Sequence, residues 1–331
     1  MTALGLSFVS PEAAAQVTSA PVHQAVADAV EPLTFGVDEP IGDIVGDPVF
    51  AGFGQHLLPR PGDAYDRDMP LSRIAALLPY HSNVRPEEIV RALDQLANDA
   101  RQGSQVFFPI YGAEEIASDP AKADTGLFFL RGRPGAPFAI IAPGGGFSYV
   151  GTVHEGLPYA TAISELGFNA FVIRYRVGLG QQAATEDMAR AISFIFESAD
   201  ALQVSTSDYS VWGSSAGARM AALIGSHGTS AFGAPDLPKP ATVVMAYTSH
   251  SDIAAAEPPT YVIVGERDGI APPSAMKRRV DILRSRGTPV EFRIVPAIGH
   301  GFGTGSGTTA EGWIGEAVDF WQAELSGAFQ P

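Results

Sequence analysis

The chain has 331 residues, with 36 acidic and 21 basic side chains and a formal net charge of −15 at pH 7. This excess of acid argues against a nucleic-acid or anionic-membrane partner, because such affinity depends on Lys and Arg meeting phosphate. Hydrophobic residues make up 46% and charged residues 17%, which is typical of a chain that buries a large core. The chain has no cysteine, which excludes disulfides, cysteine-bound metals and a thiol nucleophile.

The first seventy residues are strongly acidic, with ten acidic and two basic side chains. The segment up to about residue 33 is predicted to be a poorly ordered leader. The first basic residue is Arg60, so the positively charged start of a secretory signal is missing, although Ala13–Ala15 could imitate a cleavage site. We therefore expect a cytoplasmic protein, and secretion with a clipped signal remains the alternative.

Two helical patterns follow an irregular segment. The chain from Asp43 to Pro70 is rich in Gly, Pro and Asp, which predicts packed coil. Leu71–Leu78 and Pro86–Arg101 then show helical periodicity, the second with proline in its first turn and one apolar stripe. Residues 1–103 are thus predicted to be an acidic leader and a helical prefix that packs on the domain formed by residues 104–326.

From residue 104 onward, short apolar runs alternate with helix-length amphipathic segments. This pattern predicts an α/β fold, in which helices cover both faces of an eight-stranded, mostly parallel sheet. No helix separates the first strands, so we expect them to be antiparallel. The predicted strands lie near Gln105–Tyr111, Leu127–Arg131, Phe138–Ala142, Asn169–Tyr175, Tyr209–Trp212, Thr242–Ala246, Thr260–Val264 and Glu291–Val295. The predicted helices are Glu155–Leu166, Ala184–Leu202, Ser215–Gly225, Pro273–Arg286 and Ala310–Leu325.

The longest uncharged stretch, Pro134–His154, has enough residues to cross a bilayer. It contains three prolines and the triplet Gly144-Gly145-Gly146, which predict a strand and a loop instead. We therefore expect no membrane segment.

The strand that ends at Trp212 leads into Gly213-Ser214-Ser215-Ala216-Gly217 and a helix. In a G-x-S-x-G turn between strand and helix, the two glycines let the backbone pass close to itself while the serine exposes its Oγ. A serine at a helix start also meets the positive end of the helix dipole, which suits a developing anion. Ser215 is therefore predicted to be a nucleophile, and a simple helix cap is the alternative.

A serine hydroxyl needs a base, and the base needs a carboxylate to orient it. His300 follows the last predicted strand in a glycine-flanked loop. Asp268 follows the strand before it, and Glu266 is a rival acid that we expect to face solvent or pair with Arg267. The order serine, aspartate, histidine is one of the known chain orders of such triads.

The third requirement is a pair of backbone N–H groups that bind the oxyanion. Ala216, the residue after the nucleophile, is predicted to supply one. The run Pro143-Gly144-Gly145-Gly146-Phe147 is predicted to supply the other, because consecutive glycines let amides turn toward a ligand. The same glycines do not fit a phosphate loop, since no G-x-x-x-x-G-K pattern follows.

On these motifs, residues from about 104 to 326 resemble bacterial α/β-hydrolase esterases and lipases of the hormone-sensitive-lipase-like and feruloyl/acetyl-esterase-like groups. The resemblance implies the α/β-hydrolase fold and a carboxylic-ester hydrolase of EC class 3.1.1. It implies an acyl-serine intermediate, with neither metal nor cofactor. Matched residue by residue, it places the oxyanion donors on Gly145, Gly146 and Ala216.

This sequence departs from the family pattern at two positions. Pro143 stands where a histidine commonly opens the glycine motif, so another group must replace any hydrogen bond that the histidine would give to the loop. Ser214 stands where many relatives carry aspartate, which bears on the subgroup.

The expected substrate is a small-molecule ester with a short-chain or acetyl group. A serine exopeptidase of the prolyl-peptidase type and a non-catalytic binding protein of the same fold are the alternatives, and the sequence indicates no oligomeric state. Tyr247–Pro259 is too short to form a helical lid, so we expect the prefix or the loop Phe147–His154 to shape the pocket. Candidate pocket residues are Phe147, Tyr149, His154, Tyr247 and His250.

Overall fold

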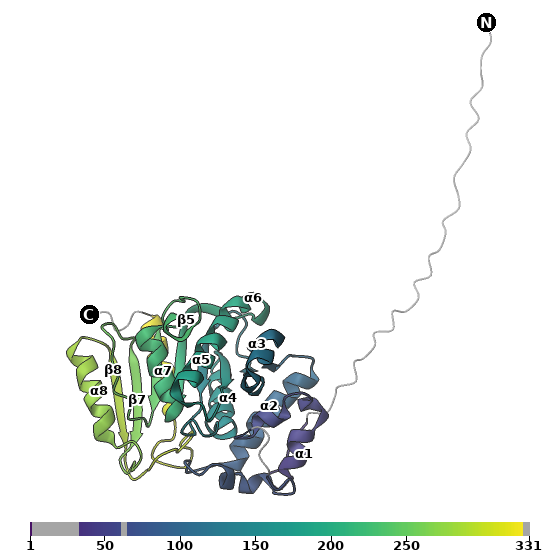
Figure 1. Cartoon of the computed structure of the whole chain (residues 1–331), viewed down its shortest axis with the longest axis horizontal. Helices are drawn as coiled ribbons and strands as arrows, with labels where there is room; N and C mark the ends of the chain where they lie inside the picture. The colour runs from purple at the N-terminus through teal and green to yellow at the C-terminus, as the bar shows by residue number, and fades with distance from the viewer. Residues whose placement is uncertain (2–32, 61–64, 327–331) are drawn as a thin grey trace. The chain divides into compact units, whose positions relative to one another are not determined.

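An eight-stranded sheet lies at the centre of the chain (Figure 1). The computed structural model describes residues 33–60 and 65–326, together with Met1. The strand order is β1-β2-β4-β3-β5-β6-β7-β8. The strands are β1 (Phe107–Phe108), β2 (Gly126–Leu130), β3 (Pro137–Ala142), β4 (Asn169–Arg174), β5 (Ser205–Ser214), β6 (Thr242–Ala246), β7 (Thr260–Gly265) and β8 (Val290–Val295).

Most of the sheet is parallel. β1 and β2 are antiparallel to each other, and β2 is antiparallel to β4, whereas every other neighbouring pair is parallel. The central strands are buried on both faces, which is why they are nearly continuous apolar runs. These observations confirm the expected α/β fold with its eight-stranded, mostly parallel sheet. β1 is shorter than predicted, since Pro109 follows it and cannot donate to a strand ladder.

Helices cover both faces of the sheet (Figure 1). On one face α4 contacts α9 and strands β2 to β4, while on the other α7 contacts α5 and strands β3, β5 and β6. The helices are α1 (Ile41–Gly46), α2 (Pro86–Arg101), α3 (Ala113–Ser118), α4 (Leu157–Glu165), α5 (Gly180–Glu197), α6 (Ala199–Leu202), α7 (Ala216–His227), α8 (Pro273–Ser285) and α9 (Trp313–Leu325).

Three helical predictions need correction in detail. The helix predicted from Glu155 begins later, because Thr152–Gly156 forms a π-helical turn before α4. The helix predicted to end at Leu202 is divided at Ser198 into α5 and α6. Leu71–Leu77 is a 3₁₀-helix. Among the described residues, no helix combines the length and the apolar character that crossing a bilayer requires.

The prefix is continuous with the hydrophobic core. The apolar stripe of α2, with Ile89, Leu93 and Leu96 each no more than 1% exposed, packs toward α4 and β2. The side chains of Asp94 and Asn98 on α2 accept the backbone N–H groups of Phe35 and Leu33. From Leu33 onward the chain therefore forms one compact unit. The domain boundary at residue 103 stays a prediction, and most of the predicted leader lies outside the described residues.

The burial of α2 predicts a large effect of a core truncation in the prefix. Leu96 is 0% exposed, so Leu96→Ala should lower the free energy of unfolding by about 2–5 kcal/mol, through lost burial and the cavity left behind. Leu179 is 55% exposed, and Leu179→Ala should change it by less than about 0.5 kcal/mol. Urea unfolding of both variants measures the difference. Equal midpoints would contradict the packing of the prefix into the core.

Candidate active site

Ser215 lies in a sharp turn between strand and helix. β5 ends at Ser214 and α7 begins at Ala216, and Ser215 between them has φ 51° and ψ −112°. Positive φ is unfavourable for a residue with a Cβ, and it recurs where a backbone is strained for function. A Cβ on Gly213 or Gly217 would overlap neighbouring backbone atoms. The two glycines of the motif are therefore required by the close approach of the backbone.

A chain of hydrogen bonds joins Ser215, His300 and Asp268. His300 Nε2 lies 2.9 Å from Ser215 Oγ, and His300 Nδ1 lies 2.8 Å from Asp268 Oδ2. Asp268 is 4% exposed, and its Oδ1 accepts the backbone N–H groups of Ile270 and Ala271 at 2.9 and 2.7 Å. These bonds fix the carboxylate so that His300 Nδ1 donates to it and Nε2 is left to accept the serine proton. The structure thus brings together the three residues that the sequence singled out.

The alternatives for two of these residues do not fit the geometry. Ser215 makes no capping hydrogen bond to α7, which excludes a simple helix cap. The rival acid Glu266 is exposed and accepts the backbone N–H of Ala297 at 3.1 Å, so its carboxylate is not the one that meets His300.

The glycine loop after β3 brings backbone amides to the nucleophile. Gly145 and Gly146 have φ of 135° and 62°, values that favour glycine. Gly146 and Ala216 line the cavity at Ser215, and within the described residues neither amide has a hydrogen-bond acceptor. Gly145 is not among the lining residues and packs against Tyr149. Two of the three predicted donors therefore lie at the cavity wall, and the role of Gly145 stays a prediction.

A buried carboxylate, that of Glu155, accepts a hydrogen bond from the glycine loop. Glu155 is 0% exposed, and its Oε2 accepts the Gly144 N–H at 2.6 Å. Its Oε1 accepts the Tyr247 hydroxyl at 2.6 Å and lies 3.1 Å from His81 Nε2. Burial alone would raise the pKa of Glu155, but the charge and hydrogen bond of His81 and the Tyr247 hydroxyl outweigh it and lower the pKa to about 2. The oxyanion loop is therefore anchored to an ionised group.

The same network reaches the nucleophile turn. The Tyr247 hydroxyl is 2.9 Å from that of Tyr159, which accepts the Ser214 hydroxyl at 3.2 Å. On the opposite side of the loop, the Tyr175 hydroxyl donates to the Pro143 carbonyl at 2.8 Å. Tyr175 and Glu155 thus give the loop hydrogen bonds in place of those that a histidine at position 143 would give.

Sequence reasoning missed Glu155 and His81. The signal for Glu155 was its position, as the first charged residue after the long uncharged run that contains the glycine loop. His81 had no such signal, because it lies in the prefix and far along the chain from the motif that it supports.

A cavity of about 270 Å³ opens at Ser215. Its walls come from the glycine loop, the start of α7 and the loops after β6, β7 and β8, and its lining residues are Gly146, Phe147, Ser215, Ala216, Arg219, Tyr247, Thr248, Ser249, Ile270, Ala271 and His300. Of the five candidate pocket residues, Phe147 and Tyr247 therefore line the cavity.

The other three candidates are core residues rather than cavity wall. Tyr149 is 1% exposed and its hydroxyl lies 2.8 Å from His81 Nδ1. His154 is 4% exposed and its Nε2 lies 3.1 Å from the Gly301 carbonyl. His250 is 7% exposed and does not line the cavity. Their aromatic rings fill space beneath the loops, which corrects their assignment to the pocket.

The prefix supports the site without lining it. Within the described chain, none of the cavity-lining residues comes from the prefix, which corrects the expectation that it shapes the pocket. Instead the Ser82 hydroxyl donates to the His300 carbonyl at 2.7 Å, and the Ser82 N–H donates to the Gly301 carbonyl at 2.8 Å. His81 reaches Glu155 from the same segment. The prefix thus contacts both the histidine loop and the oxyanion loop from outside the cavity.

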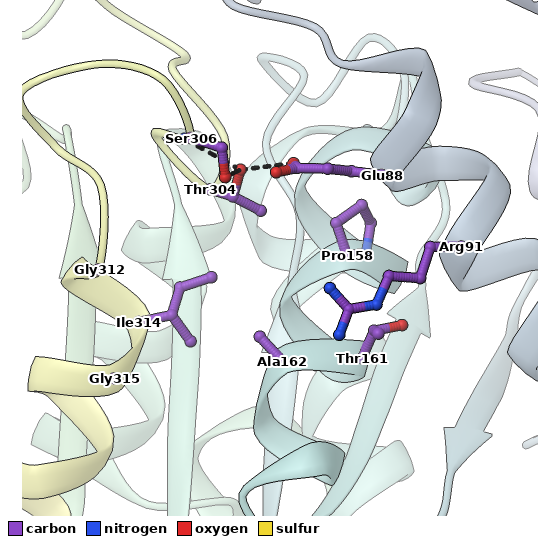
Figure 2. A pocket seen from close by; sticks show the side chains of 10 residues that line it. All are labelled: Glu88, Arg91, Pro158, Thr161, Ala162, Thr304, Ser306, Gly312, Ile314 and Gly315. Atoms are coloured by element: carbon purple, nitrogen blue, oxygen red, sulfur yellow. Dashed lines mark hydrogen bonds between the residues drawn. The ribbon is translucent and has the colours of Figure 1, made fainter.

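A second cavity, of about 200 Å³, lies beside α2, α4 and α9 (Figure 2). Its charged side chains are all paired: Glu88 accepts the Thr304 hydroxyl at 2.6 Å, and Arg91 forms an ion pair with Glu165. Figure 2 shows the hydrogen bonds that join Glu88, Thr304 and Ser306 at its rim. It holds none of the three residues of the hydrogen-bonded chain, so the cavity at Ser215 is the candidate active site.

Comparisons with known proteins agree with this architecture. Residues 131–236 match the BD-FAE family model, and residues 241–328 match that of the prolyl oligopeptidase family. A curated relative, an acetylxylan esterase of Xylanibacter ruminicola, is 28% identical over 108 residues, which is 32% of this chain and 22% of that protein. The chain therefore matches about a fifth of the length of this relative.

Solved structures extend the likeness to the fold. An α/β-hydrolase from a deep-sea metagenome of the Medee basin has a TM-score of 0.54 at 22% identity, covering 61% of this chain and 93% of that one. An acetyl ester-xyloside bifunctional hydrolase of Caldicellulosiruptor lactoaceticus has a TM-score of 0.57 at 21% identity, covering 66% and 95%. The chain has the α/β-hydrolase fold. As the resemblance implied, Ser215 lies in the turn between a sheet strand and the helix that follows it.

The buried histidines predict a loss of stability in acid. Burial, aided by the nearby His81, lowers the pKa of His154 to about 4. Between pH 6.5 and 4 the unfolded chain then binds a proton that the folded one does not, so the free energy of unfolding falls as the pH falls through this window. His154→Gln should remove roughly 1–3 kcal/mol of that pH dependence, at about 1.4 kcal/mol per pKa unit.

Urea unfolding of parent and variant at about pH 7 and about pH 4.5, on either side of most of this window, measures the difference. His56 and His250, whose pKa values burial also lowers to about 4, should keep part of the dependence in the variant. Identical pH dependence in the two proteins would show that His154 does not carry the effect.

Proposed function

We propose that the protein hydrolyses carboxylic esters through an acyl-serine intermediate, with Ser215 as nucleophile, His300 as general base and acid, and Asp268 as the group that orients the histidine. The observation that carries this proposal is the hydrogen-bonded chain with distances of 2.9 and 2.8 Å, which ends on a serine at the wall of a cavity. The acetylxylan esterase among the relatives supports the same reaction class.

The geometry supports the following sequence of steps. His300 Nε2 takes the proton of Ser215 Oγ as the oxygen bonds to the ester carbonyl carbon, and the Asp268 carboxylate stabilises the resulting imidazolium. The amides of Gly146 and Ala216, with Gly145 as the third proposed donor, bind the oxyanion. His300 then protonates the leaving alcohol as the ester C–O bond breaks. His300 then deprotonates a water molecule that attacks the acyl carbon, and it returns this proton to Ser215 Oγ as the acyl C–Oγ bond breaks and the carboxylic acid leaves.

The size of the cavity favours short acyl groups. At about 270 Å³ it is below the roughly 300–1,000 Å³ of common ligand pockets. Short-chain or acetyl esters of small molecules are therefore the proposed substrates. An acetylated sugar is a reasonable alcohol part, since one structural neighbour is an acetyl ester-xyloside hydrolase and the curated relative is an acetylxylan esterase. The proposed steps require neither metal nor cofactor.

The first test removes the proposed nucleophile and measures turnover. With p-nitrophenyl acetate, Ser215→Ala should lower kcat/KM by about a thousandfold or more, because the residue that forms the covalent bond is gone. Asp268→Asn should also cause a large loss, since it disturbs the histidine tautomer. Glu266→Gln is the matched control and should retain parental activity. Equal turnover by Ser215→Ala and the parent would end the acyl-serine mechanism.

The second test concerns the anchor of the oxyanion loop. Glu155→Gln keeps the shape of the side chain but weakens its bond to the Gly144 N–H, so kcat should fall by about tenfold to a hundredfold with a smaller change in KM. Glu165→Gln, at the exposed end of α4, is the control and should leave kcat unchanged. A parental kcat in a Glu155→Gln protein that melts at the parental temperature would refute the positioning role.

A serine exopeptidase remains a second candidate, because residues 241–328 match the prolyl oligopeptidase family. Both reactions use the same triad, so substrate choice separates them. Turnover of glycyl-prolyl-p-nitroanilide with little turnover of p-nitrophenyl acetate or butyrate, lost in Ser215→Ala, would favour the peptidase. No turnover of either substrate class would favour a non-catalytic binding protein.

A further inference from the structure

Arg219 is a cation beside the nucleophile that no other described residue neutralises. It lies in the first turns of α7, four residues after Ser215. It is half-buried and lines the cavity at Ser215. Within the described residues its guanidinium has neither an ion pair nor a hydrogen bond.

The cavity itself offers no counter-charge. None of its lining residues is an aspartate or a glutamate. Two buried arginines of the described chain are each paired with acids: Arg176 with Asp187 and Asp119, and Arg279 with Glu257. A protein with a net charge of −15 has ample acid to pair with Arg219, yet this site has none.

A second polar group in the same wall lacks a partner. Thr248, two residues after the end of β6, lines the cavity and is 2% exposed, and its hydroxyl has no hydrogen-bond partner among the described residues. A buried hydroxyl without a partner costs about 1–3 kcal/mol, and a ligand that bonds to the Thr248 hydroxyl in this cavity would recover that cost. Thr248 and Arg219 therefore supply a hydroxyl and a guanidinium to one small cavity.

We propose that the substrate ester carries a carboxylate a few carbon atoms from the scissile bond, and that Arg219 binds it, with Thr248 as an additional donor. The planar guanidinium matches a carboxylate with two parallel hydrogen bonds. A single arginine balances one negative charge, which suits a carboxylate better than a phosphate dianion. The substrate class is thus a monoester of a dicarboxylic acid or an ester of a hydroxy acid, and this inference rests on the proposed ester hydrolysis.

The test uses two matched substrate pairs that differ only in charge. The acyl-side pair is methyl hydrogen glutarate and the methyl ester of glutaric acid monoamide. The alcohol-side pair is 3-acetoxypropanoate and 3-acetoxypropanamide. In one of the pairs the parent should hydrolyse the carboxylate with about tenfold higher kcat/KM than the amide, as expected for a charge-assisted hydrogen bond. The pair that shows the preference tells whether Arg219 binds a carboxylate on the acyl side or on the alcohol side of the ester.

Variants then assign the preference to Arg219. Arg219→Met should reduce the carboxylate-to-amide ratio to about one, and Arg219→Lys should keep part of it, because a lysine retains the charge but not the planar fork. Arg278→Met, which removes an exposed arginine of α8 outside the cavity, should keep the parental ratio. Thr248→Val should lower the ratio by a smaller factor. Because each ratio is taken within one variant, a general loss of activity does not change it.

The outcomes separate this inference from the proposed function. Equal hydrolysis of acid and amide in both pairs, or a preference that survives Arg219→Met, overturns the role of Arg219. Turnover of p-nitrophenyl acetate without turnover of any of the four esters also overturns it and leaves the esterase proposal standing. No turnover of any ester, p-nitrophenyl acetate included, overturns both.

Discussion

The geometry of the candidate active site depends on a carboxylate that is removed from water. Glu155 is 0% exposed, and an ionised group so buried is tolerable only when several donors replace its hydration. The donors come from three separate parts of the chain: the Gly144 amide after β3, the Tyr247 hydroxyl after β6 and the His81 ring in the prefix. The charge is stable only when all three are in place, which couples the folding of the prefix to the geometry of the oxyanion loop.

This coupling explains how the prefix supports the candidate active site although it does not line the cavity. His81 contacts Glu155 behind the glycine loop, while the neighbouring Ser82 donates to the His300 carbonyl. The loops that follow β3 and β8 thus both depend on contacts with one short segment of the prefix. The prefix, and not a lid inserted between β6 and β7, supports these loops, and the connection between those two strands is correspondingly short.

The parts that sequence reasoning predicted are those fixed by local rules. The turn at Ser215 needs glycines at fixed positions. The strand before Asp268 is a nearly continuous apolar run and the strand before His300 alternates apolar and charged residues, so these features are visible over a few residues. The network of Glu155 is different, since its partners lie 11, 74 and 92 positions away and no local pattern joins them. Periodicity also cannot tell which way a loop aromatic points.

The aromatic pocket candidates show this limit. Phe147 and Tyr247 line the cavity, whereas Tyr149, only two residues after Phe147, turns inward to His81. The choice depends on backbone angles in the loop, where Gly146 and Phe147 both have positive φ, and a sequence pattern does not reveal them. Closeness to a motif in the sequence therefore predicts that a residue lies near the site, but it does not predict which way the side chain points.

The net charge of a whole protein likewise does not predict the charge inside one of its cavities. A net charge of −15 describes the long-range field of the molecule, which disfavours polyanions. It does not describe the cavity at Ser215, where the described lining residues include Arg219 but no aspartate or glutamate. For an anion at contact distance, the attraction of an unpaired guanidinium exceeds the repulsion from distant acidic side chains, because water and salt screen that repulsion. An acidic protein can therefore select an anionic substrate, provided that the anion is small and its charge lies where Arg219 meets it.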